Sequence, residues 1–328
     1  MPASNVGSPL LWGVFAAFVI LVMVLDLGVF HRRAHTVGMK EAGAWVFVWV
    51  SLAIVFNLGV WFYFGSGKAL EFLTGYLIEL SLSVDNLFVF IAIFSYFAVP
   101  TSLYHRVLFW GIVGAIVMRA AVIGVGVALV DRFQFVLYVF GAILIWTAYK
   151  LVFSKQEGVH PERNPVVKLF RKFFPVTDSY EGSRLFLRRN GRLWATPLVI
   201  VLLVVETTDL VFALDSIPAI FGVTTDPFII YTSNVFAILG LRALFFLLAG
   251  FITYFRFLRY GLAAVLAFIG CKLLIMKWVH MPTGVSLAVV GSLLALSVIA
   301  SIFIPKRLSG ESRGAEGAPP GGGPAQGR

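Results

Sequence analysis

The sequence has little of what disulfide-bonded, zinc-binding or soluble proteins need. Of its 328 residues one is cysteine, five are histidine and only 13% are charged. A single cysteine, Cys271, cannot form an internal disulfide, and no Cys/His run has zinc spacing. An ordinary soluble domain is about one quarter charged. These shortages exclude a disulfide framework, a thiolate metal site and a soluble domain, so any bound metal has to be held by oxygen.

What the sequence has in excess is apolar residues, which make up 59% of the chain and give a mean hydropathy of +0.93. A membrane-spanning helix needs about 20 mostly apolar residues. Nine stretches meet this requirement, near 9–30, 43–64, 72–97, 106–130, 133–153, 196–221, 228–254, 260–279 and 284–304. The pattern predicts an all-α polytopic membrane protein. The first eight residues lack Lys and Arg, so we expect the first stretch to be a retained span rather than a cleaved signal.

The organisation predicted from these stretches is one transmembrane domain over 1–305. Its single long connection, 154–195, is basic and polar. The tail 306–328 is rich in Gly, Pro and Ala without apolar periodicity, and is therefore predicted to be disordered.

The distribution of Lys and Arg predicts the orientation. With nine spans, one side holds most of them, including those of 154–195, whereas the other side holds Lys68, Arg132, Lys272 and Lys277. By the positive-inside rule the C-terminus is cytoplasmic and the N-terminus is outside. The net charge of +10 is then explained by topology and by contact with anionic lipid headgroups, without a nucleic-acid partner. The oligomeric state is not indicated.

Residue spacing indicates an inverted repeat of three helices, about 72–155 and 196–279. Asp85 precedes Arg119 by 34 residues, and Asp209 precedes Arg242 by 33. The local sequence around Asp85, Ser-Val-Asp-Asn-Leu-Phe, also resembles Thr-Thr-Asp-Leu-Val-Phe around Asp209. The two copies start from opposite sides of the membrane. Such repeats place a substrate site near the bilayer midplane and let one copy rock against the other.

Acidic residues inside two spans are the main candidates for chemistry. They are Glu79 and Asp85 in the third span, and Glu206, Asp209 and Asp215 in the sixth. An ionised Asp at the centre of a membrane helix costs roughly 2.5 to 3.5 kcal/mol. A purely structural role would pair these carboxylates with Arg119 and Arg242, as counter-ions. Two cations cannot neutralise five carboxylates, so the excess requires a metal ion or protons.

Helical geometry limits which of these groups can share one ion. At about 100° per residue, Glu79 and Asn86 lie on one face, and Glu206 lies within about 60° of Asp209. Asp215 points away from Glu206, and Asp85 away from Glu79. We therefore expect Pro218 to break the sixth span beside Asp215, which would free the carbonyl of Leu214 as a further ligand.

The available ligands are carboxylates, an amide and carbonyls, which are hard oxygen donors. They suit Mg²⁺, Ca²⁺ and Mn²⁺ rather than copper or zinc. Ser83 and Thr208 are possible secondary ligands, although bonding within the helix is their commoner use. Asn234 could line a pathway or form an interhelical hydrogen bond. We expect no permanently bound cofactor and no enzymatic activity.

The residues from Glu79 to Phe90 and from Val205 to Ile220 resemble the paired signature of the TerC family, especially its Alx branch. The resemblance covers nearly the whole chain. It implies manganese export within the LysE superfamily, and a metal site formed by Glu79, Asp85, Asn86, Glu206, Asp209 and Asp215. It also implies a bacterial plasma membrane and a link to alkaline pH and tellurite resistance. Leu80 departs from the family, where Lys is common, and this removes a charge beside the site.

Three function classes compete at this point. A secondary transporter is favoured by the inverted repeat. A membrane partner of the secretion machinery, assisting assembly or metal loading of exported proteins, would be favoured by a large outer domain. An intramembrane hydrolase would need a nucleophile with a base, or a zinc motif. Neither of the last two features occurs in the sequence, so transport of a divalent metal is the leading hypothesis, with manganese as substrate.

Overall fold

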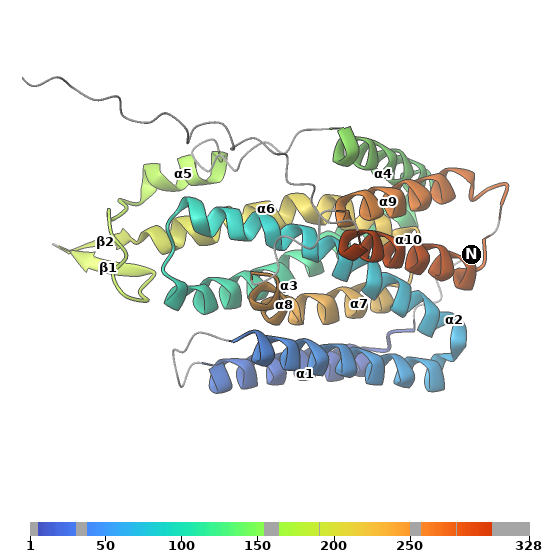
Figure 1. Ribbon diagram of the computed structural model, residues 1–328, viewed down its shortest axis with the longest axis horizontal. Coiled ribbons are helices and arrows are strands. Elements are labelled where there is room, and N and C mark those ends of the chain that lie inside the picture. Colours follow the sequence, from blue (N-terminus) through green and yellow to red (C-terminus); the bar gives the residue numbers. More distant parts are fainter. Residues whose placement is uncertain are drawn as a thin grey trace, which may run out of the picture.

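The computed structural model of the chain describes residues 6–30, 38–153, 164–189, 191–249, 257–279 and 281–303. Its helices run mostly along the long axis of the molecule (Figure 1). They are α1 (Pro9–Phe30), α2 (Met39–Tyr96), α3 (Thr101–Arg132), α4 (Val136–Phe153), α5 (Pro165–Phe173), α6 (Pro197–Phe221), α7 (Pro227–Leu239), α8 (Leu241–Ala249), α9 (Leu258–Ile275) and α10 (Thr283–Phe303). The predicted all-α membrane fold is confirmed.

The number of membrane crossings follows from helix length. Within the described ranges, seven helices are long and apolar enough to cross a membrane, with α7 and α8 taken together. Helix α2 has 58 residues, or about 87 Å, nearly three times the hydrocarbon core. It turns at Gly65, where φ is 86°, a conformation that only glycine adopts without strain. The two parts of α2 match the predicted spans 43–64 and 72–97. Helix α1 matches the predicted span 9–30, although its apolar described part, Pro9–Leu25, is shorter than the seven.

The predicted seventh span is interrupted. Helix α7 ends at Leu239 and α8 begins at Leu241, with Gly240 between them. At the other end of α7, the Asp226 carboxylate accepts hydrogen bonds from the backbone N–H groups of Phe228 and Ile229 at 3.0 and 3.4 Å. This N-cap, followed by Pro227 at the first helical position, fixes where the chain turns back into the membrane.

The expected break beside Asp215 is wrong. Helix α6 continues from Pro197 to Phe221 with Pro218 inside it. Pro218 stands three residues before the end of the helix, so less than one turn of helix follows it and a kink there has little helix to redirect. Because Pro218 has no N–H, the carbonyl of Leu214 lacks its usual partner within the helix, and its role as a ligand stays a prediction.

The basic connection contains structure that the sequence analysis did not predict. Helix α5 lies within it, followed by an antiparallel hairpin of β1 (Phe186–Arg189) and β2 (Arg192–Ala195). Asn164 caps α5 by accepting hydrogen bonds from two backbone N–H groups, and Pro165 follows it. Both elements lie at the end of the bundle where α6 begins (Figure 1). The predicted disordered tail, 306–328, lies outside the described residues.

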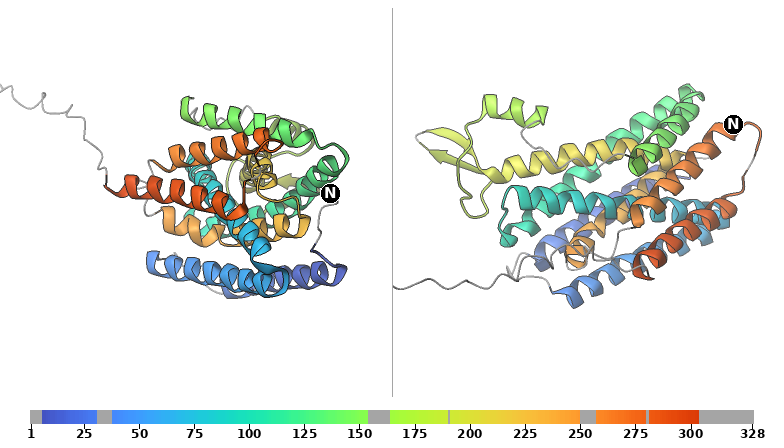
Figure 2. Two further views of the ribbon diagram at one scale, coloured as in Figure 1. Left: turned by 90° about the vertical axis from the view of Figure 1, so that its right-hand side faces the viewer. Right: turned by 45° about the horizontal axis from the view of Figure 1, so that its top comes forward.

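Two features of the packing position the acidic helices. Helix α1 and the first part of α2 form a layer along one side of the bundle, and α6 runs through its middle (Figures 1 and 2). Helix α4 packs directly against α9. A Cβ at Gly141 would lie 3.0 Å from the Gly270 carbonyl oxygen, so the two backbones touch here. Small residues allow this approach, which is the usual basis of helix association in lipid.

Candidate functional site

An ion-paired cluster lies in the interior, where the second part of α2, α3, α6 and α7 meet. Arg119 of α3 donates through Nη2 to Glu79 Oε1 of α2 at 2.9 Å, and both side chains are almost fully buried. The other oxygen of Glu79 accepts a hydrogen bond from Asn234 Nδ2 of α7 at 2.8 Å. Glu79 is therefore held from two helices and is fully satisfied by the protein. This matches the interhelical hydrogen bond that was one of two expectations for Asn234.

Arg119 also reaches α6. Its Nη1 donates to Ser216 Oγ at 2.6 Å, and its Nε lies 3.7 Å from Asp209 Oδ2. The latter contact is too long for a hydrogen bond, and neither of these two atoms has a hydrogen-bond partner. Arg119 thus sits between two carboxylates and satisfies only Glu79. With all three groups ionised, the cluster carries one uncompensated negative charge, and Asp209 holds the unsatisfied oxygen.

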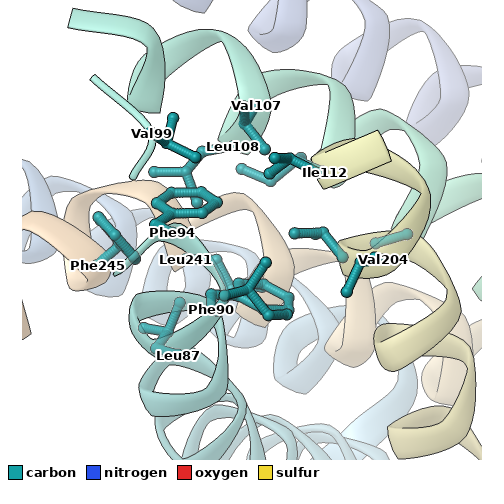
Figure 3. Close-up of a cluster of buried hydrophobic side chains, with 14 of the residues drawn as sticks. Leu87, Phe90, Phe94, Val99, Val107, Leu108, Ile112, Val204, Leu241 and Phe245 are labelled. Atoms are coloured by element: carbon teal, nitrogen blue, oxygen red, sulfur yellow. The ribbon is translucent and has the colours of Figure 1, made fainter. Parts of the chain in front are cut away.

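A small cavity opens beside Asp209. Its volume is about 20 Å³, enough for roughly one water molecule. Asp209 is the one charged residue in its wall, and the other lining residues are apolar or glycine: Leu87, Phe90, Leu108, Gly111, Ile112, Ala115, Val205 and Leu241. Several of them belong to the buried cluster drawn in Figure 3, which α2, α3, α6 and α8 share. Asp209 therefore faces this apolar cluster, which lies between it and the beginning of α6 and is called the apolar plug below.

Glu206 lies one turn from Asp209 on α6 and is half-buried. Its carboxylate rests directly against Gly114 of α3, so closely that a Cβ at position 114 would overlap it. Asp209 is the nearest charge that acts on it. Two acidic residues of α6 thus face α3 at neighbouring levels, and a glycine makes room for one of them.

The remaining predicted ligands point elsewhere. Asp215 accepts a hydrogen bond from Thr147 Oγ1 of α4 at 2.9 Å. The charged group that acts on Asp85 is Arg259 at the beginning of α9, and Asn86 is buried. Over the described ranges, no three His, Cys, Asp or Glu side chains gather closely enough to hold a metal ion. The structure brings together Glu79, Asp209 and Arg119, with Glu206 beside them, and leaves Asp85 and Asp215 apart.

The hydroxyl groups near the acidic residues bond within their own helices. Thr208 donates to the carbonyl of Val204 at 2.7 Å, and Ser83 donates weakly to Glu79 Oε1 at 3.4 Å. Arg242 is buried at the second position of α8, directly after Gly240.

Comparison with known proteins decides the family. The model of the integral membrane protein TerC family matches residues 64–309. The chain belongs to the TerC family. A membrane protein of Myxococcus xanthus, STKORF319, is 54% identical over 91% of this chain and 94% of its own. Alx of Escherichia coli K12, whose name describes it as a candidate membrane-bound redox modulator, is 47% identical over 93% of this chain and 98% of its own. No solved structure matches.

This TerC protein has a second polar cluster, which the sequence analysis did not find. It closes the end of the bundle that lies away from the hairpin. Lys68 Nζ of α2 lies 2.9 Å from Glu71 Oε2 and 3.2 Å from Asp226 Oδ2. Thr224 Oγ1 donates to Glu71 Oε2 at 2.6 Å. Asp226 also accepts from the backbone N–H of Val6 at 3.1 Å. The cluster ties α2 to the α6–α7 loop and to the N-terminal segment. The Asp226-Pro227 pair was the available signal, because it marks a helix start at a membrane boundary.

Proposed function

We propose that this TerC protein exports divalent metal ions, manganese first, across the bacterial plasma membrane through the acidic centre of the bundle. The observation that carries the proposal is the charge imbalance at Arg119. This one cation touches two buried carboxylates, pairs with Glu79, and leaves Asp209 with an oxygen that has no hydrogen-bond partner. Burying a charge is costly unless it is paired. A metal ion as substrate would supply the missing positive charge.

The donor set supports a hard metal ion. Asp209 and Glu206 project from neighbouring turns of α6, and Glu79 faces them across Arg119. Carboxylate oxygens in such a set favour Mg²⁺, Ca²⁺ or Mn²⁺. The cavity beside Asp209 is too small for a hydrated ion, so loading requires movement of α3 against α6.

Alternating access would provide that movement. The apolar plug of Figure 3 closes one side of Asp209, and the Lys68 cluster closes the opposite end of the bundle. This arrangement corresponds to an occluded state. The proposed inverted repeat is supported by contacts between matched helices, since the second part of α2 contacts α6, α3 contacts α7, and α4 contacts α9. Each proposed copy therefore has its counterpart as a direct neighbour.

Proton coupling follows from the charge of the centre. Asp215 and Asp85 lie apart from it, near the cations Lys150 and Arg259. In the centre, Glu79, Glu206 and Asp209 with Arg119 sum to minus two when ionised, which one Mn²⁺ balances. Protons on the empty carrier would balance the same charge when the metal is absent. We expect manganese binding to release about one proton or more per ion, which permits proton-for-metal exchange.

The decisive experiment measures manganese binding to purified protein by calorimetry, in two buffers of different ionisation enthalpy. Asp209→Asn should abolish binding, whereas Asp131→Asn, at an exposed position near the end of α3, should leave it unchanged. Unchanged binding in Asp209→Asn would refute the proposed site. A binding enthalpy independent of buffer would remove the proton exchange and leave uniport.

The direction of manganese transport and the orientation of the chain in the membrane need separate tests. In sealed vesicles of known orientation, manganese should move outward, and an inward proton gradient should accelerate it. A reporter fused after residue 305 should be cytoplasmic, and a tag at residue 2 should be external, as the distribution of Lys and Arg predicts. Both termini on one side would contradict nine crossings and the inversion with them.

The name of the Alx relative raises the question of a redox role. This chain contains one cysteine, Cys271, which is exposed. One thiol cannot cycle through an internal disulfide. Any effect of this protein on cellular redox balance is therefore proposed to be indirect, through the supply of a redox-active metal such as manganese.

A further inference from the structure

Helix α5 has three distinct faces. At about 100° per residue, Val167 and Phe170 share the face toward the bundle, and Val167 is only 4% exposed. A second face carries the cations Lys168, Arg171 and Lys172, all exposed. The third face is an apolar stripe of Val166, Leu169 and Phe173, which are 40%, 55% and 73% exposed. The stripe is therefore not part of the core that anchors the helix.

The position of α5 favours a membrane surface as the occupant of this stripe. The helix packs on α6, beside its first half, at the end of the bundle that carries the hairpin (Figures 1 and 2). Further along α6, Leu210, Val211 and Leu214 are also exposed, as expected of residues that face lipid. The stripe thus extends the apolar surface of the bundle to the end that is predicted to be cytoplasmic.

Charge complementarity identifies the lipid class. The basic face of α5 is joined on the hairpin by the exposed Arg188 and Arg192. A helix with an apolar face beside a basic face lies at the boundary of headgroups and acyl chains, and it prefers anionic lipid. Each Lys or Arg near such a surface raises the affinity for anionic lipid about fivefold.

Asn164 connects this helix to the candidate site. Its Oδ1 caps α5 by accepting from the backbone N–H of Val166 at 2.9 Å. Its Nδ2 donates to Thr207 Oγ1 at 2.7 Å. Thr207 directly follows Glu206 on α6 and lies two residues before Asp209. One side chain therefore holds both the start of α5 and the acidic segment of α6.

We propose that α5 is an interfacial helix that binds anionic phospholipid at the cytoplasmic leaflet, and that Asn164 transmits its docking to the acidic segment of α6. Docking is independent of the transport proposal, whereas its effect on transport rests on that proposal. Phospholipid charge would then set how firmly α6 is held, and thereby how readily the centre opens.

Docking is tested by fluorescence in reconstituted vesicles. Leu169→Cys is made in a Cys271→Ser background and labelled with an environment-sensitive dye, and Ser179→Cys in the exposed loop serves as control. Spin-labelled lipid should quench the dye at 169 strongly in phosphatidylglycerol vesicles and weakly in phosphatidylcholine. Lys168→Gln with Lys172→Gln should lower the docked-to-undocked ratio about 25-fold, at roughly fivefold per cation. Equal quenching in both lipids, or quenching at 169 no greater than at 179, would overturn the proposal.

A second variant tests the coupling between docking of α5 and manganese flux. Asn164→Ser keeps an N-cap residue, but its shorter side chain cannot reach Thr207. Quenching at 169 should be unchanged, while manganese flux should lose its dependence on the anionic-lipid fraction. Flux that keeps this dependence in Asn164→Ser would refute the coupling. If the unmodified protein moves no manganese at all, the transport proposal fails, and the quenching result still decides whether α5 docks.

Discussion

Replacing Arg119 by methionine should destabilise the protein more than replacement of any other arginine on α3. Methionine approximates the length of the side chain but removes its contacts with Glu79, Ser216 and Asp209. Two buried carboxylates then remain without a cation. Removing one partner of a buried ion pair costs about 3 to 5 kcal/mol, because the other charge stays buried and unpaired. We expect a loss of this size in the free energy of unfolding.

A second substitution separates charge from packing. Glu79→Gln keeps the shape of the side chain and its ability to accept from Asn234, but removes the charge that Arg119 had neutralised. In the double variant one carboxylate, Asp209, lacks a compensating cation, so the cluster carries the same net charge of minus one as in the unmodified protein. The double variant should therefore recover about 0.5 to 3 kcal/mol relative to Arg119→Met, the range measured for directly contacting residues.

The assay is equilibrium unfolding in mixed detergent micelles, with the four proteins of the double-mutant cycle. Arg132→Met is the matched control, because Arg132 is exposed at the end of the same helix, where it lies over the ring of Phe133. It should change stability by less than 1 kcal/mol. If Arg119→Met were as stable as this control, or if Glu79→Gln brought no recovery, the central ion pair would not be the structural element described above.

Two further predictions concern other contacts. Gly114→Ala should lower manganese binding and flux, since the added methyl group overlaps the Glu206 carboxylate, whereas Gly124→Ala on the same helix meets nothing within 4 Å and should be neutral; equal behaviour of the two variants would contradict the placement of Glu206. The Tyr180 hydroxyl donates to the Phe97 carbonyl at 2.9 Å, and burial raises the pKa of Tyr180. This contact stabilises the fold below about pH 10, the ordinary tyrosine value, and is lost as pH rises through the higher folded pKa. Tyr180→Phe should abolish that alkaline step in thermal unfolding and cost about 1 kcal/mol at neutral pH.

The positions of the membrane helices could be predicted from sequence because the bilayer demands long apolar stretches and little else supplies them. The orientation of Asp215 could also be predicted, since nine residues along a helix place it on the opposite face from Glu206. The break at Pro218 was wrong because its effect depends on where α6 ends. Only three residues of α6 follow Pro218, so its ring has almost no helix beyond it to redirect.

Other features depend on contacts between distant segments. Gly114 accommodates Glu206 from another helix, and a glycine in an apolar span carries no signal of that role. The Lys68–Asp226 contact joins residues that are separated by nearly half of the chain. Helix α5 is different, because its start was visible: Asn164 followed by Pro165 is a common helix-start pattern. It went unpredicted because nine residues are too few to stand out within a basic connection.

The proposed inverted repeat makes a prediction about Arg242 that the contacts in this structure alone do not make. In this structure Arg119 lies near Asp209, so the arginine of the first copy serves the aspartate of the second. Exchange of conformations between the copies would give Arg242 the same duty toward Asp85, which here lies near Arg259 instead. Arg242→Met should therefore reduce manganese flux at least tenfold while leaving the Glu79–Arg119 pair, and manganese binding in the occluded state, largely intact. Flux and calorimetry on the same preparation separate these effects. Full manganese flux in a well-expressed Arg242→Met protein would mean that the two proposed copies do not exchange roles. A loss of manganese binding equal to that of Asp209→Asn would instead place Arg242 in the site of the resting state.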